Sequence, residues 1–454
     1  MGIKMYQKII IANRGEIAVR IIRACREMGI GTVAVCSTAD KDALHAQLAD
    51  ECICIGSERP KDSYLNMEQI LSAAVATGAQ AIHPGFGFLS ENTVFARMCE
   101  RCGIEFIGPA PDMIDSMGNK SEARKTMIKA GVPVIPGTEE AMTDAKEAKK
   151  YADGIGYPVI IKASAGGGGK GMRVAHTPEE FETLFEVAQQ ETRTAFGDDK
   201  MYLEKYLAFA RHIEFQVLAD KYGNTVHLGE RDCSIQRRHQ KMVEETPAVI
   251  LEPELRKRMG EAAVAAAKAV GYYSAGTIEF LVDDEKNFYF MEMNTRIQVE
   301  HPVTEMVTDV DLIQEMIRIS AGEKLPFTQE EIEFRGHAIE CRVTAENPDQ
   351  MFRPNAGKIT DLYFPGGKGV RIDTSLFQGY VVPPYYDSML AKIIVHGKTR
   401  EEAIRKMKSA LGELVIEGIE TNVDFLFGLV GSEEFRDGDV RTINAELERR
   451  CTTC

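Results

Sequence analysis

The first 118 residues of this 454-residue chain alternate short apolar runs with helical stretches, and this alternation constrains the fold more than any other feature. Residues 8–12 and 31–36 are apolar runs, and residues 15–28 between them have helical spacing. A strand, a helix and a second strand in this order form a βαβ unit with parallel strands. A further strand at 81–83 runs into a glycine-rich turn at 84–88. We therefore predict a parallel-sheet domain over residues 1–118.

The rest of the chain changes character twice. Residues 119–330 have an α+β pattern, and residues 331–454 read as a β-rich domain of short strands interrupted by Gly and Pro, with a late helix. In the middle region we predict helices at 120–130 and 253–270, a strand at 159–162 and two hairpins, 214–218 with 225–228 and 277–282 with 288–293.

Composition narrows the class of protein. The chain is 44% hydrophobic, but no run approaches the roughly 18 apolar residues of a membrane-spanning helix, and the start lacks a signal-peptide pattern. The formal net charge of -15 argues against a general attraction to nucleic acid or to anionic membranes. Ten scattered cysteines suggest reduced thiols, and the Cys99/Cys102 and Cys451/Cys454 pairs lack further metal ligands at the usual spacing. We expect a cytoplasmic protein.

A glycine tract at 166–169 points to phosphate binding. It fails the Walker pattern, and its match to GxGxxG lacks the strand with an acidic residue that a dinucleotide site needs. Glycines let backbone amides approach phosphate oxygens closely, although a tract that stood alone would also suit a flexible linker. Lys162 precedes the tract and Lys120 begins the earlier helix, so two ammonium groups are available for a polyphosphate.

The second hairpin carries a possible metal site. If its loop is the two residues Glu285 and Lys286, then Glu279 lies opposite Glu292, and Asn294 shares the face of Glu292. Facing carboxylates repel unless a positive charge lies between them, and oxygen-only ligands suit magnesium. A simply solvated strand face is the competing interpretation.

The run that follows the hairpin combines a guanidinium, an amide and a carboxylate. On an extended segment Arg296, Gln298 and Glu300 share a face, while a basic run at 237–241 and Arg342 add further cations. Such a set can bind a small planar oxyanion and supply a base. A salt-bridged loop is the alternative.

Together these segments resemble the biotin carboxylase family, and the resemblance spans nearly the whole chain. The matching motifs are Asn13-Arg14-Gly15-Glu16, His83-Pro84-Gly85, Lys162 with the glycine tract, Glu204-Lys205-Tyr206-Leu207, Arg231-Asp232-Cys233-Ser234, Arg237-Arg238-His239-Gln240-Lys241, Glu292-Met293-Asn294-Thr295-Arg296, Gln298-Val299-Glu300-His301-Pro302 and Pro383-Pro384-Tyr385-Tyr386-Asp387-Ser388-Met389. The resemblance implies a Rossmann-like N-terminal domain (1–118), an ATP-grasp domain (119–330) with a mobile glycine-rich lid over about 133–205, and a β-rich C-terminal domain (331–454).

The resemblance also assigns roles to residues. It implies contacts with ATP for Lys120, Lys162, Gly168, Gly169, Glu204, Lys205, Tyr206, Leu207, His212, Gln236 and His239. It implies that Glu279, Glu292 and Asn294 hold two magnesium ions, or manganese, and that Lys241, Arg296, Gln298 and Val299 position bicarbonate. Glu300 is then the base that forms carboxyphosphate with ATP, and Arg342 stabilises the biotin oxygen.

The same resemblance implies partners. The chain lacks an Ala-Met-Lys-Met segment that receives biotin, so a separate biotin carboxyl carrier protein and separate carboxyltransferase subunits are expected, with a homodimer as the assembly. Acetyl-CoA carboxylase, and hence fatty acid synthesis, is the favoured context, and a split pyruvate or other acyl-CoA carboxylase is the rival.

Some positions depart from the family pattern, and other classes stay open. Phe86 stands where the family often has tyrosine, Lys170 replaces a frequent arginine, and the pair Cys451/Cys454 matches nothing interpretable. The competing hypotheses are another ATP-grasp ligase, such as a carbamoyl-phosphate synthetase or purine-pathway carboxylase, an inactive nucleotide-binding scaffold, and a dehydrogenase. The run from Arg296 to Glu300 and Arg342 argue against the first.

Overall fold

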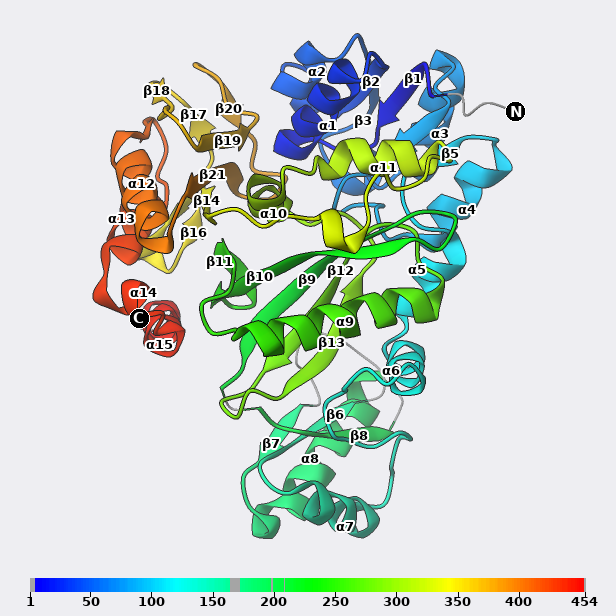
Figure 1. Ribbon diagram of the computed structural model, residues 1–454, viewed down its shortest axis with the longest axis vertical. Coiled ribbons are helices and arrows are strands. Elements are labelled where there is room, and N and C mark those ends of the chain that lie inside the picture. Colours follow the sequence, from blue (N-terminus) through cyan, green and yellow to red (C-terminus); the bar gives the residue numbers. More distant parts are fainter. Residues whose placement is uncertain (1–4, 164–171, 197–198, 208, 453–454) are drawn as a thin grey trace. The chain divides into compact units, whose positions relative to one another are not determined.

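The predicted parallel sheet at the N-terminus is confirmed. The computed structural model describes residues 5–163, 172–196, 199–207 and 209–452 (Figure 1). Its first sheet has the strand order β3-β2-β1-β4-β5, and every neighbouring pair is parallel. The elements are β1 (Lys8–Ile11), α1 (Gly15–Glu27), β2 (Gly31–Ser37), α2 (Leu44–Leu48), β3 (Glu51–Gly56), α3 (Met67–Thr77), β4 (Ala81–His83), α4 (Thr93–Arg101), β5 (Glu105–Phe106) and α5 (Pro111–Gly118).

Helix α1 joins this sheet to a later part of the chain. Ile17 and Ile21 recur four residues apart and share a buried cluster with Met316 and Ile317 of α11 (Leu312–Ser320). Side chains four positions apart lie on one helix face, so α1 is fixed by packing along its apolar side. The preceding strand β1 is fully buried at Ile9, Ile10 and Ile11, as expected for the centre of a parallel sheet.

An eight-stranded sheet forms the middle of the fold, in the order β13-β12-β9-β10-β11-β14-β21-β19. The strands are β9 (Arg211–Ala219), β10 (Thr225–Arg237), β11 (Gln240–Thr246), β12 (Ser274–Val282), β13 (Phe288–Asn294), β14 (His337–Thr344), β19 (Val370–Thr374) and β21 (Met389–Gly397). The first predicted hairpin, β9 with β10, is confirmed, with Thr225 opposite Ala219. The predicted helix α9 (Pro253–Val270) packs against β10 (Figure 1).

The second hairpin is present, but its loop is not the two-residue one on which the pairing of Glu279 with Glu292 depended. The Asp283 N–H donates to the Asn287 carbonyl at 3.0 Å, and the Lys286 N–H donates to the Asp283 carbonyl at 3.1 Å. Three residues, ending in Lys286 at φ 66°, therefore form the turn. The loop has one residue more than the two assumed, which shifts the pairing of β12 with β13 by one position. The turn therefore does not place Glu279 directly opposite Glu292.

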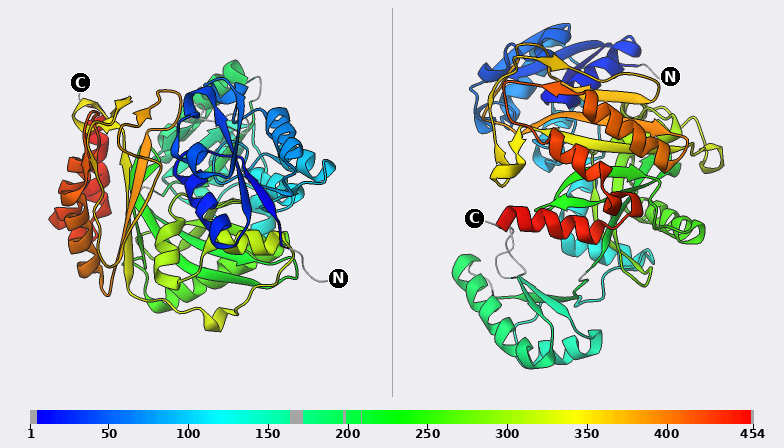
Figure 2. Two further views of the ribbon diagram at one scale, coloured as in Figure 1. Left: turned by 90° about the horizontal axis from the view of Figure 1, so that it is seen from above. Right: turned by 90° about the vertical axis from the view of Figure 1, so that its left-hand side faces the viewer.

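The C-terminal region covers one face of strands β14 and β21 with helices (Figure 2). Its core contains Ile393 and Val395 of β21 together with Ala403 and Met407 of α12. Helix α10 (His301–Thr308) precedes this region. The helices and remaining short strands of the region are β15 (Glu346–Asn347), β16 (Arg353–Pro354), β17 (Gly357–Lys358), β18 (Leu362–Tyr363), β20 (Val381–Val382), α12 (Arg400–Glu413), β22 (Val415–Ile416), α13 (Val423–Gly431), α14 (Glu433–Asp437) and α15 (Val440–Thr452).

The chain divides into two compact units. The first contains residues 1–119, 212–279 and 292–454, and the second contains residues 120–211 and 280–291. The second unit contains a three-stranded antiparallel sheet, β7-β6-β8. Its strands share one buried cluster with Phe181 and Phe185 of helix α8. Its elements are α6 (Lys120–Lys129), α7 (Ala145–Ile155), β6 (Val159–Ala163), β7 (Arg173–Ala175), α8 (Pro178–Phe196) and β8 (Met201–Lys205).

Among the described helices, none is both long enough and apolar enough to cross a membrane.

Candidate active site

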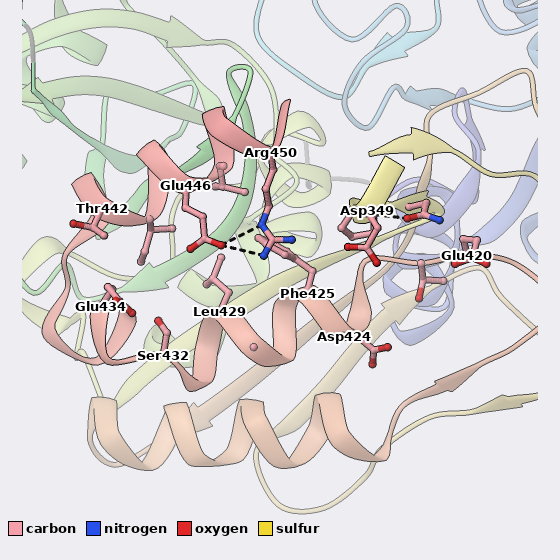
Figure 3. Close-up of a pocket in the computed structure, with 16 residues that line it drawn as sticks. Asp349, Glu420, Asp424, Phe425, Leu429, Ser432, Glu434, Thr442, Glu446 and Arg450 are labelled. Atoms are coloured by element: carbon pink, nitrogen blue, oxygen red, sulfur yellow. Dashed lines mark hydrogen bonds and ion pairs between the residues drawn. The ribbon is translucent and has the colours of Figure 1, made fainter. Parts of the chain in front are cut away.

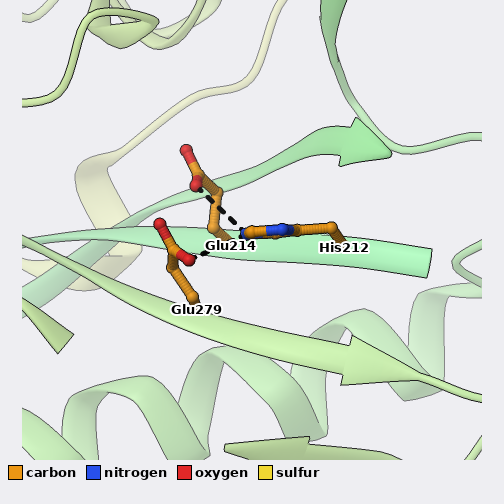
Figure 4. Close-up of side chains that lie close together, drawn as sticks. All are labelled: His212, Glu214 and Glu279. Carbon is orange, nitrogen blue, oxygen red and sulfur yellow. Dashed lines mark ion pairs between the residues drawn. The ribbon is translucent and has the colours of Figure 1, made fainter. Parts of the chain in front are cut away.

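A buried group of acids and one histidine lies on neighbouring strands of the large sheet. His212 and Glu214 are two residues apart on β9 and therefore point to the same face, and Glu279 comes from the adjacent β12 (Figure 4). The His212 Nε2 atom lies 2.9 Å from Glu279 Oε2 and 3.8 Å from Glu214 Oε2. Burial lowers the pKa of His212, but the hydrogen bond to Glu279 together with the charges of Glu279 and Glu214 raises the pKa overall.

Lys241 of β11 binds three carboxylates at once. Its Nζ atom lies 2.6 Å from Glu214, 2.6 Å from Glu300 and 3.2 Å from Glu279. An ammonium group has three protons to donate, so each carboxylate receives one contact. Burial raises the pKa of Glu279, whereas Lys241 and His212 hold it well below its usual value, so Glu279 is ionised at neutral pH.

Arg231 of β10 is a second cation beneath this group and is fully buried. Its guanidinium donates to Glu214 at 2.6 Å, and it also donates to four neutral side chains, one on the same strand as Glu214 and three on other segments. These acceptors are Gln216 (2.8 Å), Thr304 (3.0 Å), Thr277 (3.1 Å) and Gln298 (2.8 Å). With all of its donors used internally, Arg231 fixes the positions of the side chains around it.

The end of β13 and the segment after it bring two of the expected residues against Glu279 and a third, Arg296, against Asn294. The side-chain amides of Asn294 and Gln298 donate to Glu279 Oε1 at 2.8 and 2.7 Å. Arg296 donates to Asn294 Oδ1 at 2.8 Å and to Glu91 at 2.9 Å. Glu91 also accepts from the Thr295 backbone N–H at 2.9 Å, so it fixes this turn from the N-terminal domain.

Glu300 lies between two cations. One oxygen accepts from Lys241 at 2.6 Å and the other from Arg342 of β14 at 2.8 Å. The carboxylate is 2% exposed. Burial raises its pKa, but Lys241, Arg342 and the buried Arg231 together hold the pKa of Glu300 well below its usual value. Glu300 is therefore ionised while both cations bind it.

Arg342 also forms an ion pair with Glu244. The Oε1 atom of Glu244 on β11 accepts from Arg342 Nε at 2.6 Å and lies 2.5 Å from Nη2 in an ion pair. Burial and the nearby Glu300 charge raise the pKa of Glu244 to about 7, while Arg342 opposes the shift. Glu244 is opposite Glu340 in the strand register, and both oxygens of the fully buried Glu340 lack hydrogen-bond partners among the described residues.

Lys392 of β21 supports the same segment from another side. This lysine is completely buried, and its Nζ donates to the Val299 carbonyl at 2.8 Å. It also lies 3.0 Å from Glu16 of α1 and 3.8 Å from Asp373 of β19. The backbone between Gln298 and Glu300 is therefore fixed by a buried cation that belongs to the C-terminal domain.

The remaining expected residues of the first unit are less closely connected to this cluster. The Gln236 side chain contacts His212 Nδ1 at 3.0 Å, whereas His239 is exposed in the turn between β10 and β11 at φ 64°. Glu292 is half-buried on β13. The Cys233 thiol, which belongs to one of the family motifs, lies 3.9 Å from Glu300.

In the second unit, the expected ATP residues lie along β6 and β8. Lys162 and Glu204 form an ion pair across these antiparallel strands. Lys205 donates to the carbonyls of Gly156 (2.8 Å) and Tyr157 (2.9 Å), so its ammonium group is used within the fold. Tyr206 and Leu207 follow β8, and Lys120 begins α6. Gly168, Gly169 and Lys170 lie outside the described residues.

Motifs and spacing did not indicate the roles of four partners, of which Glu214, Arg231 and Glu244 are buried and Glu91 is exposed. Glu214, Arg231 and Glu244 lie on strands and Glu91 lies in a turn, and only Arg231 belongs to one of the family motifs. Their roles depend on which strands are neighbours. The sequence does offer one signal for such partners. Charged residues are rarely buried, so a charged residue at a strand position that alternation predicts to be buried indicates a partner in an ion pair.

A cavity of about 460 Å³ lies elsewhere, among α13, α14 and α15 (Figure 3). Its lining includes Asp424 and Glu434, and also Arg450, which is paired with Glu446 at 3.0 Å. None of the residues described above lines it.

Comparison with known families covers most of the chain. The model "Biotin carboxylase, N-terminal domain" matches residues 5–114, "Carbamoyl-phosphate synthase L chain, ATP binding domain" matches 119–328, and "Biotin carboxylase C-terminal domain" matches 340–446. Biotin carboxylase 1 of Bacillus subtilis is 59% identical over 96% of this chain and 98% of its own length. One of the pyruvate carboxylase subunits of Methanothermobacter thermautotrophicus is 54% identical over 98% of this chain and 91% of its own length.

Solved structures agree with these matches. The biotin carboxylase domain of a thermophilic 2-oxoglutarate carboxylase bound to bicarbonate has a TM-score of 0.94 at 48% identity, covering 99% of this chain and 100% of that chain. The corresponding dimer from Hydrogenobacter thermophilus, in complex with MgADP and bicarbonate, has a TM-score of 0.88 at 51% identity and covers 96% of both chains.

The fold and these matches define an ATP-dependent ligase of the ATP-grasp class. Within that class, the chain belongs to the biotin carboxylase family, and the resemblance found in its sequence is confirmed. The matches at both ends distinguish it from the carbamoyl-phosphate synthetases, with which it shares the central ATP-binding domain.

Proposed function

We propose that Glu300, Lys241 and Arg342 form the catalytic centre at which this chain carboxylates biotin on a separate carrier protein, with ATP and bicarbonate as substrates. The observation that supports this most directly is the position of Glu300 between the two cations, at 2.6 and 2.8 Å. A buried carboxylate accepts the bicarbonate proton, and the cations stabilise the oxyanions formed on either side.

The contacts of Glu300 suggest how its basicity is controlled. While Lys241 and Arg342 both bind it, its pKa is too low for an effective base. Bicarbonate, positioned by Lys241, Arg296, Gln298 and the backbone at Val299, draws the Lys241 ammonium towards its own oxygens. Glu300 then loses one cation, its proton affinity rises, and it removes the bicarbonate proton. The resulting oxyanion attacks the γ-phosphorus of ATP and forms carboxyphosphate.

For ATP, we propose the residues that the resemblance assigned. They are Lys120, Lys162, Gly168, Gly169, Glu204, Lys205, Tyr206, Leu207, His212, Gln236 and His239. The ammonium groups of Lys120 and Lys162 suit phosphate oxygens.

For metal, we propose Glu279, Glu292 and Asn294 as ligands of two magnesium ions, or manganese. These side chains suit a magnesium ion because Glu279 is ionised and buried. The Asn294 amide now donates its N–H to Glu279, and rotation of the amide by half a turn would place its oxygen beside Glu279 as a second ligand. Bound metal would neutralise phosphate charge during transfer.

Arg342 serves the second half of the reaction. Carboxyphosphate breaks down to carbon dioxide and phosphate, and the phosphate takes the ureido proton of biotin. The biotin oxygen then carries negative charge, which the Arg342 guanidinium stabilises. Its two contacts with Glu244 keep the guanidinium oriented while biotin enters and leaves.

The acyl acceptor and partners are the finer part of the proposal. We propose acetyl-CoA carboxylase as the context that the resemblance favours, and the relatives named as pyruvate and 2-oxoglutarate carboxylase subunits support a split carboxylase as the second candidate. In either case the chain acts in the cytoplasm as a homodimer, with a biotin carboxyl carrier protein and carboxyltransferase subunits. Reconstitution with each type of transferase, with acetyl-CoA, pyruvate and 2-oxoglutarate offered in turn, separates the candidates.

The activity itself is tested by transfer of labelled carbon from bicarbonate to free biotin. We expect transfer that requires ATP and magnesium together. ATP binding without any transfer of label, to free biotin or to a biotinylated carrier, would contradict the proposed function.

A further inference from the structure

Three cysteines lie on two neighbouring strands at one edge of the N-terminal sheet. Cys36 is on β2, and Cys52 and Cys54 are on β3, which is the edge strand. The register pairs Cys36 with Cys54, and Ala34 with Cys52. Because side chains alternate along a strand, all three thiols point to the same face of the sheet.

Two of these thiols are in contact. The Sγ atoms of Cys36 and Cys52 are 3.4 Å apart, whereas the Cys54 thiol donates to the Gly56 carbonyl at 3.7 Å. Cys52 is exposed, while Cys36 is only 3% exposed. The contact with Cys36 lowers the pKa of Cys52, which favours its thiolate, and raises the pKa of Cys36. The solvent-facing sulfur of the pair is therefore the better nucleophile.

We propose that Cys36 and Cys52 are an oxidative modification site that forms a reversible intrachain disulfide with a low-molecular-weight disulfide as the oxidant. The Cys52 thiolate attacks one sulfur of the oxidant, whose S–S bond breaks, and one small thiolate leaves. Cys36 then attacks Cys52 Sγ, and the second small thiolate leaves. Two protein S–H bonds are lost, one S–S bond forms, and the oxidant is reduced to two thiols.

The geometry explains why such a bond is reversible. Cys36 and Cys52 are diagonal neighbours and not opposite each other, and the register is interrupted directly after Cys36. The sulfurs must approach from 3.4 Å to about 2.05 Å, so the two strands have to shift. Strained and partly exposed disulfides are reduced more easily than relaxed buried ones. The bond therefore forms under oxidising conditions and opens again when reductant returns.

The test uses the folded, full-length chain, incubated with oxidised glutathione and analysed by intact mass and peptide mapping. Wild type and the matched control Cys54→Ser are expected to lose two hydrogen atoms and to yield a Cys36–Cys52 linked peptide, which dithiothreitol removes. Cys36→Ser is expected to stop at the first step, with glutathione retained on Cys52. Cys52→Ser is expected to form no bond to Cys36.

The proposal is overturned if wild type retains glutathione on Cys52 to the same extent as Cys36→Ser, because Cys36 then does not attack. It is equally overturned if Cys52 stays unmodified, or if mapping links Cys52 to Cys54.

Discussion

At the scale of single residues, the site is a problem of charge balance. Glu214, Glu279 and Glu300 are all buried, and each contacts the one ammonium group of Lys241. Arg231 and Arg342 supply the further positive charge. A buried carboxylate without a cation would be protonated, and a protonated Glu300 would be unable to accept a proton from substrate. The cations thus keep the proposed base ionised until substrate arrives.

Glu300→Gln tests the proposed base. The amide keeps the shape but accepts no proton, so we expect turnover to fall by about 100-fold or more, with ATP affinity changed little. Phosphate release and nucleotide binding measured on the same preparation check this. Near-normal turnover would remove Glu300 from the role of base.

Glu244→Gln tests the proposed support of Arg342. Loss of a charged partner with two contacts weakens the hold on the guanidinium by about 1.5–3 kcal/mol, so we expect kcat/KM for biotin to fall roughly tenfold or more. The KM for ATP should stay the same. If biotin kinetics are unaffected and only stability changes, Glu244 has a structural role alone.

Glu340→Gln tests the buried acid behind Glu244. Burial raises the pKa of Glu340 well above 4.5, its ordinary value, so the folded state holds a proton that the unfolded state releases above that pH. Wild-type stability therefore decreases as pH rises above about 4.5, by at most about 1.4 kcal/mol per pH unit from this group. We expect a smaller decrease in the variant, measured by urea unfolding from pH 5 to 8. Identical slopes would contradict this account of Glu340.

At the scale of elements, the sequence predicted what depends on local pattern. The hairpin of β9 with β10 and the helix α9 follow from apolar alternation and from a run rich in Ala, Lys and Glu. The loop length assumed for the second hairpin was one residue too short, because Asp283 pairs with Asn287 and closes a three-residue loop. Apolar patterning does not distinguish a three-residue loop from a two-residue loop.

In the candidate site, too, some residues could be predicted from local sequence and others could not. Lys241, Glu300 and Arg342 were indicated by motifs that resemble a family, and the structure brings them together. Glu214, Arg231 and Glu244 were missed, because their importance arises from strands β9, β10, β11 and β14 being neighbours. The order of strands in a sheet depends on long-range packing, which no local spacing of residues specifies.

Lys392 is the clearest case of one element stabilising another. It connects β21 to α1 through Glu16 and to the Val299 carbonyl, with no exposure to solvent. Lys392→Met leaves buried acids without their cation, so we expect the free energy of unfolding to fall by about 3–5 kcal/mol. Urea unfolding checks this, with the exposed Lys398→Met as the matched control. A loss below about 1 kcal/mol would show that the pair is not important for stability.

At the scale of the whole molecule, the family and the fold agree over nearly the full chain. The chain carries a formal net charge of -15, yet its proposed substrates, ATP and bicarbonate, are anions. Binding must therefore depend on local cations, and the Lys241, Arg296 and Arg342 side chains supply them in the first unit. Overall charge predicts little about ligands when a few buried groups set the local field.

The most direct test of the central claim is phosphate release from ATP by the purified chain, with magnesium and bicarbonate, in the presence and absence of free biotin. We predict release that depends on bicarbonate and increases with biotin, because Arg342 and Glu300 are proposed to couple carboxyphosphate formation to biotin. Release that is indifferent to biotin, even when a biotinylated carrier protein is supplied, would contradict the account.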